Sequence, residues 1–211
     1  MGTSKQEMME RHLIDRGISD PRVLQAMWEV DRSLFVPEEI RQQSYEDKAL
    51  PIGMGQTISQ PYIVAYMAQA MGLGPEDVVL EVGTGCGYNA AVLARIVSRV
   101  YSIEVIEWLA RLAPENLTRS GTGNVTTRQG DGYLGWPEAA PFDAIMLTAA
   151  PPVIPKPLTQ QLKIGGRLLA PVGTNLQRLV MLVRARENYF VEKELMPVKF
   201  VPMTGEAQRR H

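Results

Sequence analysis

The sequence lacks the features of several protein classes. Its 211 residues include one cysteine, Cys86, so no internal disulfide forms and a cysteine-rich metal site is excluded. No apolar run approaches the roughly 20 residues that cross a bilayer. Basic and acidic residues are nearly equal in number, 22 against 23, so the basic stripe of a nucleic-acid-binding protein is missing. Residues 1–11 are polar and lack the apolar core of a secretion signal. We therefore expect a cytoplasmic protein with no metal, membrane or nucleic-acid partner.

The chain length and the patterning predict a single domain over residues 1–211. We divide it into an N-terminal helical cap with the segment that follows it (1–74), an α/β core (75–174), and a C-terminal hairpin with a tail (175–211). In the cap, apolar positions at helical spacing predict a helix over 20–30. A polar loop follows, and we interpret Gly53 and Gly55 there as turn residues rather than hinges.

Short apolar runs alternate with helical segments in the middle of the chain. The pattern predicts strands at 78–82, 100–103, 125–127, 143–147 and 167–171, and helices at 89–96 and 106–120. Such an alternation is typical of a parallel sheet covered on both faces. Runs at 179–184 and 189–194, joined through 187–188, predict an antiparallel hairpin at one edge of the sheet. The predicted fold class is α/β, with a mostly parallel central sheet and an antiparallel C-terminal hairpin.

The strand at 78–82 leads into a glycine-rich loop, Gly83-Thr84-Gly85-Cys86-Gly87. Glycines there allow positive φ angles and the close approach of a ligand, and the N-terminus of the next helix suits a carboxylate or a phosphate. The spacing G-x-G-x-G, with Tyr88 in place of the last dinucleotide glycine, argues against a dinucleotide. Glu81 would repel a pyrophosphate and attract an ammonium group. These features favour S-adenosylmethionine, which has an amine, a carboxylate and no phosphate.

Two acidic residues follow the next two predicted strands. Glu104 comes about twenty residues after the loop, where a carboxylate can accept hydrogen bonds from both ribose hydroxyls. Asp131 and Gly132 follow the third strand, where an acid commonly meets an adenine amino group. Each acid alone would be interpreted as a polar strand end, but together, in register with the glycine loop, they favour cofactor binding. Cys86 is interpreted as a small packed side chain rather than a nucleophile, because neither histidine lies near it in the sequence.

The segment 50–62, LPIGMGQTISQPY, closely resembles the substrate motif of the protein-L-isoaspartate O-methyltransferases. Further segments resemble that family in order along nearly the whole chain, at 35–37, 45–47, 130–132, 141–143, 148–150, 161–168, 171–173 and 200–203. The resemblance implies a Rossmann-like, seven-stranded methyltransferase fold with a reversed final strand. It also implies methyl transfer from S-adenosylmethionine to the free carboxylate of L-isoaspartyl residues in damaged proteins. S-adenosyl-L-homocysteine would be the product, and repair would proceed through a succinimide.

The resemblance also implies roles for individual residues. Ser59 matches the active-site serine of the family, and the substrate peptide is expected to contact Thr57, Ile58, Thr148 and Val201. The cofactor-binding residues predicted from the loop, the two acids and this family are Glu81, Gly83, Thr84, Gly85, Gly87, Glu104, Asp131 and Gly132. Two residues depart from the family pattern. Cys86 replaces a serine, and Pro114 is expected to kink or shorten the helix after Glu104.

The implied reaction needs no general base, because a carboxylate with a pKa of about 4 is already ionised at neutral pH. Catalysis then depends on alignment of the reactants and exclusion of water. Ser59 is predicted to orient the substrate carboxylate, since the sequence offers no base that would make it a nucleophile. The alternative is that Ser59 and Thr57 cap the helix that starts near Pro61, and for Thr57 both roles can hold.

Two other functions stay open at this point. One is methyl transfer to a small molecule or a nucleic acid, and segment 57–61 argues against it. The other is a cofactor-binding adaptor without turnover, against which the intact Ser59, Glu81, Glu104 and Asp131 argue. A nicotinamide dehydrogenase is inconsistent with the loop spacing. We expect isoaspartyl proteins and peptides as partners, and a monomer, with a weak oligomer left open.

Overall fold

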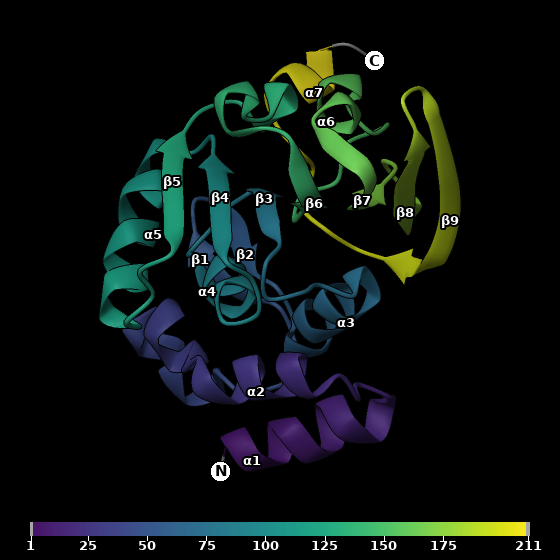
Figure 1. Cartoon of the computed structure of the whole chain (residues 1–211). Coiled ribbons are helices and arrows are strands. Elements are labelled where there is room, and N and C mark those ends of the chain that lie inside the picture. Colours follow the sequence, from purple (N-terminus) through teal and green to yellow (C-terminus); the bar gives the residue numbers. More distant parts are fainter. Residues whose placement is uncertain (1, 210–211) are drawn as a thin grey trace.

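The computed structural model describes residues 2–209 and contains a seven-stranded sheet in the order β5-β4-β3-β6-β7-β8-β9 (Figure 1). The strands β5, β4, β3, β6 and β7 run parallel to one another, and β8 is antiparallel to both of its neighbours. The reversed strand is therefore β8, and the final strand β9 resumes the direction of β7. The strands are β3 (Val78–Val82), β4 (Arg99–Glu104), β5 (Val125–Gln129), β6 (Phe142–Leu147), β7 (Leu162–Val172), β8 (Gln177–Arg186) and β9 (Tyr189–Val198).

Helices precede the sheet and connect its parallel strands. The α-helices are α1 (Lys5–Glu7), α2 (Pro21–Glu29), α3 (Pro61–Met71), α4 (Tyr88–Ala94), α5 (Glu107–Arg119), α6 (Lys156–Gln160) and α7 (Glu206–Arg209). A π-helical turn, η1 (Met8–Leu13), and five 3₁₀ turns complete the set: η2 (Ile14–Arg16), η3 (Arg32–Phe35), η4 (Glu38–Gln43), η5 (Gly132–Leu134) and η6 (Pro137–Ala139). Within residues 2–209 no helix is long and apolar enough to cross a membrane.

Helix α2 shows why the sequence pattern predicts the local structure. The Asp20 side chain accepts a hydrogen bond from the backbone N–H of Arg22, and Pro21 occupies the first helical position. The buried side of the helix carries Val23, Ala26 and Met27, which lie three and four residues apart. The helix predicted over 20–30 is thereby confirmed.

The predicted strands and the C-terminal hairpin are confirmed, with small differences at their ends. Strand β7 begins at Leu162 rather than Arg167, and the β8–β9 turn lies at residues 187–188 as predicted. The shortening expected at Pro114 is wrong, because α5 continues past it to Arg119. Its buried residues, among them Leu109 and Leu117, hold it on the sheet, and this packing outweighs the missing N–H.

Two hydrophobic clusters cover the two faces of the sheet. On β3, Val79 belongs to one cluster and Leu80 to the other, as alternation along a strand requires. The Val79 cluster includes Met27 of α2 and Met67 of α3, so the N-terminal helices share their core with the sheet. Figure 1 shows these helices gathered on one side of the molecule, away from α6 and α7. The N-terminal segment thus packs as a cap on the sheet.

The strand order reverses at β3, which pairs with β4 on one side and with β6 on the other. In open α/β sheets, ligands bind outside the carboxyl ends of the strands at such a switch point. The glycine-rich loop leaves β3 at that end, and Glu104 closes β4 beside it.

Candidate active site

The glycine-rich loop packs tightly against the elements around it. Gly83 has a φ angle of +103°, and a Cβ there would lie 2.4 Å from Thr148 Oγ1, at the end of β6. Gly87 has a φ angle of +91°, and a Cβ there would lie 3.3 Å from the carbonyl oxygen of Ala113 on α5. Only glycine can adopt the positive φ angle and also fit the small space at each position without a shift of the neighbouring atoms. Gly83 and Gly85 line a cavity, whereas Gly87 lies outside its lining.

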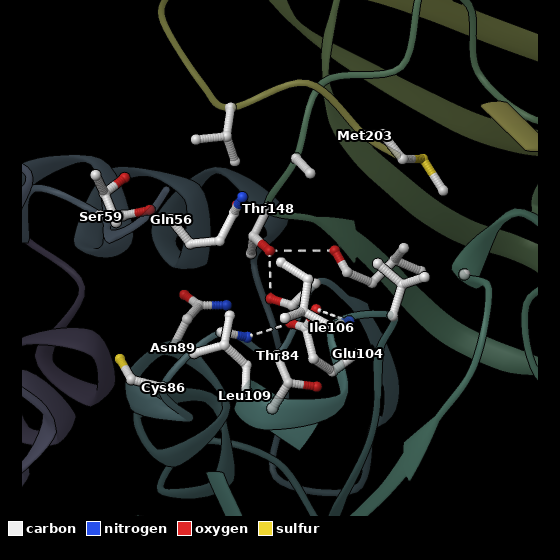
Figure 2. Close-up of a pocket in the computed structure, with 18 of the residues that line it drawn as sticks. Gln56, Ser59, Thr84, Cys86, Asn89, Glu104, Ile106, Leu109, Thr148 and Met203 are labelled. Atoms are coloured by element: carbon white, nitrogen blue, oxygen red, sulfur yellow. Dashed lines mark hydrogen bonds between the residues drawn. The ribbon is translucent and has the colours of Figure 1, made fainter. Parts of the chain in front are cut away.

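Glu104 holds the ends of two loops together. Its Oε2 accepts a hydrogen bond from the backbone N–H of Gly85 at 2.7 Å, and its Oε1 accepts from that of Ile106 at 2.9 Å. The side chain is nearly buried but still lines the cavity. A carboxylate has about four acceptor positions, so two remain for other donors. Figure 2 shows Glu104 and Ile106 on one side of the cavity, with Ser59 and Gln56 on the other.

Glu81 lies beneath the loop and is completely buried. It accepts hydrogen bonds from the Ser102 hydroxyl and from Asn89 Nδ2, and the Ser102 hydroxyl also pairs with that of Thr84 at 2.6 Å. Burial raises the pKa of Glu81 to about 7, against the lowering effect of these hydrogen bonds. Glu81 does not line the cavity; Thr84 and Asn89, which its network holds, do.

Asp131 acts as a cap for two short helices. Its Oδ1 accepts a hydrogen bond from the N–H of Tyr133 in η5, and its Oδ2 accepts from the N–H of Glu206 in α7. The side chain lies outside the cavity lining, whereas its neighbour Gly132 is part of it. The structure therefore gives Asp131 a positioning role for the C-terminal segment, and any contact with an adenine amino group stays a prediction.

A two-stranded hairpin, β1 (Leu50–Gly53) and β2 (Gln56–Ile58), was not predicted from the sequence. Its two turn residues, Met54 and Gly55, have φ angles of 53° and 71°, the left-handed pair that a two-residue hairpin requires. The tip packs on α5, since a Cβ at Gly53 would lie 3.2 Å from the Trp108 ring. The interpretation as a turn residue is confirmed for Gly55, whereas Gly53 is the last residue of β1 and directly precedes the turn.

The hairpin delivers Ser59 to the site and does not use it as a helix cap. Helix α3 begins with Gln60 at the N-cap position, without a side-chain cap bond. Asp47 takes the capping role, because its Oδ1 accepts from the N–H of Tyr62 and its Oδ2 from Gln60 Nε2. The capping alternative for Ser59 and Thr57 is therefore wrong. Among the described residues, the Ser59 hydroxyl has no hydrogen-bond partner.

Two cavities meet at one wall. The first holds about 810 Å³ and lies over the glycine-rich loop. The second holds about 1010 Å³ and lies between the start of α3 and the segment after β9. Thr57, Ser59, Thr148 and Val201 line both cavities. Val201 is held there because its carbonyl oxygen accepts from the N–H of Ala150 at 2.8 Å.

Cys86 is 3% exposed, and burial raises the pKa of its thiol to about 11. Its backbone carbonyl accepts a hydrogen bond from Asn116 of α5 at 2.8 Å. A neutral, buried thiol is a poor nucleophile, which supports the interpretation of Cys86 as a packed side chain.

Nearly the whole chain matches one family. The model of the protein-L-isoaspartate(D-aspartate) O-methyltransferases matches residues 3–208. The chain belongs to this family. Protein-L-isoaspartate O-methyltransferase 1 of Geotalea uraniireducens (strain Rf4) is 55% identical over 202 residues, which cover 95% of this chain and 92% of that relative. The Synechococcus sp. (strain JA-2-3B'a(2-13)) protein-L-isoaspartate O-methyltransferase is 52% identical over 209 residues, 95% of this chain and 85% of the relative.

Solved structures agree with the family. A protein-L-isoaspartate O-methyltransferase superposes with a TM-score of 0.87 at 30% identity, covering 97% of this chain and 67% of that one. A Plasmodium falciparum structure described as a protein of the same kind, in complex with S-adenosyl-L-homocysteine, gives a TM-score of 0.84 at 25% identity, covering 95% and 97%. The family, the fold, the enzyme class and the S-adenosylmethionine cofactor predicted from the sequence are confirmed.

Most residues predicted for this methyltransferase lie together in the structure. All of them except Glu81, Gly87 and Asp131 line the first cavity. Ile58 faces the first cavity only, although it was predicted as a substrate contact. Sequence reasoning missed several lining residues: Asn89, Ile106, Leu109 and Met203 in the first cavity, and Arg16 and Gln60 in the second. The position of Asn89 in the first helical turn after the loop could have indicated its role, whereas no pattern in the neighbouring sequence indicates that of Arg16.

The first cavity fits S-adenosylmethionine by the chemistry of its lining. Among the described residues that form it, Glu104 alone carries a charge. A cavity without a basic side chain is a poor site for the phosphates of a dinucleotide. Glu104 could accept hydrogen bonds from ribose hydroxyls, and the apolar side chains of Ile106, Leu109 and Met203 could enclose a planar base.

Proposed function

We propose that this enzyme methylates the free carboxylate of L-isoaspartyl residues in damaged proteins, and that Ser59 holds that carboxylate at the wall between the two cavities. The observation that carries the proposal is the set of four residues common to both cavities. A methyltransferase must bring a cofactor and an acceptor together from separate openings, so the reacting atoms meet where the openings join. Ser59 and Thr148 supply the hydroxyl groups at that place, together with Thr57.

The charges of the two cavities support this division of roles. The first cavity has one charged residue, the acidic Glu104, within the described chain. The charged residues of the second cavity are Arg16 and Lys199, and both are basic. Arg16 is paired with Asp47, whereas no carboxylate in residues 2–209 forms an ion pair with Lys199. A positive potential attracts an anionic acceptor and lowers the free energy of a bound carboxylate. The first cavity therefore suits the cationic cofactor and the second suits an isoaspartyl peptide.

S-adenosylmethionine, when bound, supplies a methyl carbon that a carboxylate oxygen can attack, with a neutral thioether as the leaving group. The chain's own contribution is to align the acceptor and keep water out. Ser59 has a free hydroxyl that can donate to one oxygen of the substrate carboxylate, leaving the other oxygen to react. The Thr148 hydroxyl donates to a backbone carbonyl at the end of β3, so it is left to accept from the substrate backbone. No proton leaves the carboxylate, and no base is needed.

The peptide is proposed to lie along the second cavity in an extended form. One side of that cavity is formed by residues 196–201, which are the end of the edge strand β9 and the segment that follows it. An extended backbone offers main-chain hydrogen bonds that do not depend on the neighbouring side chains, as repair of many different proteins requires. Thr57 and Val201 would hold the peptide on both sides of Ser59, while Ile58 closes the first cavity.

Repair would then follow by collapse of the methyl ester to a succinimide. The cytoplasmic location and the monomeric state are part of the proposal.

The proposal is tested by transfer of a radiolabelled methyl group from S-adenosylmethionine to two synthetic peptides that differ only in an aspartyl or isoaspartyl linkage. We expect label on the isoaspartyl peptide alone, released by base as methanol. Absence of label on both peptides, with calorimetry still showing cofactor binding, would contradict the proposal and favour another methyl acceptor or an adaptor role.

A further inference from the structure

Arg32 is the largest side chain that the structure buries completely, with 0% of its surface exposed. It stands at the start of η3, outside the linings of both cavities. No carboxylate in residues 2–209 forms an ion pair with it. Its guanidinium donates instead to three backbone carbonyls: Ser44, Lys48 and Ser59. The Nε atom has no partner, and the Tyr88 ring lies 5.6 Å from the guanidinium carbon.

A buried cation that forms no ion pair is an expensive feature. Removal of such an ion from water has a large free-energy cost, and hydrogen bonds to carbonyl oxygens offset only part of it. Burial lowers the pKa of Arg32, yet arginine stays protonated in proteins. A fold that only needed to fill this space could use an apolar side chain of similar volume. The three carbonyls that Arg32 holds therefore indicate its purpose.

Two of the three carbonyls, those of Lys48 and Ser59, flank the hairpin that delivers Ser59. Nη2 lies 3.3 Å from the Lys48 oxygen, before β1, and 2.9 Å from the Ser59 oxygen, after β2. One nitrogen thus ties the two ends of the β1–β2 hairpin together. Nη1 donates to Ser44, at the end of η4. The backbone of Ser59 is in this way attached to the core of the cap, while its hydroxyl stands at the wall between the cavities.

We propose that Arg32 is a positioning residue for methyl transfer: its guanidinium fixes the Ser59 carbonyl and thereby the place of the Ser59 hydroxyl. The inference rests on the proposed role of Ser59. Only a planar fork reaches carbonyls in several directions, whereas a lysine ammonium on the same stem is a single point. A misplacement of about 1 Å at a reacting centre can cost about a hundredfold in rate. The Arg32 fork is therefore required for the reaction as well as for the fold.

The first test compares Arg32→Lys with Arg32→Gln in the full-length enzyme. Both variants should lower kcat for the isoaspartyl peptide by about 10-fold to 100-fold. Their dissociation constants for S-adenosyl-L-homocysteine, measured by calorimetry, should stay within about threefold of wild type. If Arg32→Lys fails to fold, Arg32→Gln alone is used for the test. Because no carboxylate within residues 2–209 forms an ion pair with Arg32, its removal breaks no salt bridge.

Arg167 of β7, which is partly exposed and forms an ion pair with Asp77, provides a control for the loss of a guanidinium away from the site. Its Nε is also buried without a partner, and its guanidinium also donates to a backbone carbonyl, that of Gly72, at 3.0 Å. It lines neither cavity. Arg167→Lys should lower the melting temperature while leaving kcat within about twofold. Equal losses of kcat in Arg32→Lys and Arg167→Lys at matched stability would show that Arg32 acts on the fold alone.

A double-mutant cycle with Ser59→Ala gives the deciding result. If Arg32 acts through the Ser59 hydroxyl, then either Arg32 variant should cost less than about threefold in kcat once that hydroxyl is gone. The same 10-fold to 100-fold loss in both backgrounds would overturn the inference. Wild-type labelling of the isoaspartyl peptide is measured first. If the wild-type enzyme does not label the peptide, the proposed function and this inference are refuted together. If it does, and the losses of kcat in the Arg32 and Ser59 variants are additive, only the role of Arg32 is refuted.

Discussion

Asn89 Nδ2 lies 2.8 Å from Glu81 Oε1, so a polar side chain of the first cavity is oriented by a carboxyl group that solvent does not reach. The second Glu81 oxygen accepts from Ser102, which also pairs with Thr84. Two side chains of the cavity wall, Asn89 and Thr84, are thereby fixed from below by one acid. Glu81 is part of the site through these neighbours, and its protonation state influences both the stability and the polarity of the wall.

Glu81→Gln should stabilise the protein more at pH 8 than at pH 5. Burial raises the pKa of Glu81 from 4.5 to about 7, so the folded state binds its proton more tightly than the unfolded state does. Wild-type stability therefore falls as the pH rises from about 4.5 to about 7, and stays lowered above that range. Removal of the charge should recover a free energy of unfolding on the order of 2–3 kcal/mol at pH 8 and little at pH 5.

Urea denaturation at the two pH values measures this difference. Glu115→Gln, the same change at an exposed position on α5, is the matched control and should show a much smaller dependence on pH. An equal effect of Glu81→Gln at pH 5 and pH 8 would mean that Glu81 is not neutral in the folded protein at low pH.

Cys86 should be unreactive in the folded enzyme. Burial excludes reagents and raises the pKa of its thiol to about 11, so almost no thiolate exists at pH 8. Reaction with a disulfide reagent such as Ellman's reagent should be at least a hundredfold slower than that of free N-acetylcysteine, and should become fast in 8 M urea. Rapid labelling of the native protein would show that the loop opens far more than its packing suggests.

The sequence predicts the core of this fold well because two strong patterns coincide there. Short apolar strands, β3 among them, alternate with helices along the chain. The loop that follows β3 requires glycine. Local chemistry therefore determines the position of Gly83, Thr84, Gly85 and Glu104. The N-terminal elements are harder to predict, since the β1–β2 hairpin is short and depends on packing against Trp108.

The residues missed by sequence reasoning depend on contacts between distant segments. Arg16 reaches the second cavity through an ion pair with Asp47, 31 residues later, and stacks on the Tyr62 ring at 3.5 Å. Arg32 reaches the Ser59 carbonyl across 27 residues. No periodicity connects such positions. Asp131 is a recognised motif residue that lies outside the cavity lining and whose two oxygens each accept from a backbone N–H, so its predicted contact with the cofactor stays a prediction.

Glu104→Gln should weaken cofactor binding by at least tenfold. The two oxygens of Glu104 accept from Gly85 and Ile106, and a glutamine amide would place N–H groups against one of those donors. It would also lose the charge that suits ribose hydroxyls. Calorimetry with S-adenosyl-L-homocysteine measures the change, and Glu107→Gln, exposed three residues later, is the control. Unchanged affinity in Glu104→Gln would remove Glu104 from the proposed cofactor site.

Ser59→Ala should lower kcat for the isoaspartyl peptide by about 10-fold to 100-fold, because a hydrogen bond to a charged group is worth about 1.5–3 kcal/mol. Cofactor affinity should change little, because the proposed partner of the Ser59 hydroxyl is the substrate carboxylate. Initial rates at saturating peptide, with calorimetry for S-adenosyl-L-homocysteine, separate the two effects. Ser19→Ala, an exposed serine outside both cavities, is the control. A large loss of cofactor binding in Ser59→Ala, with kcat retained, would place this serine in the cofactor site and leave the substrate carboxylate without its proposed donor.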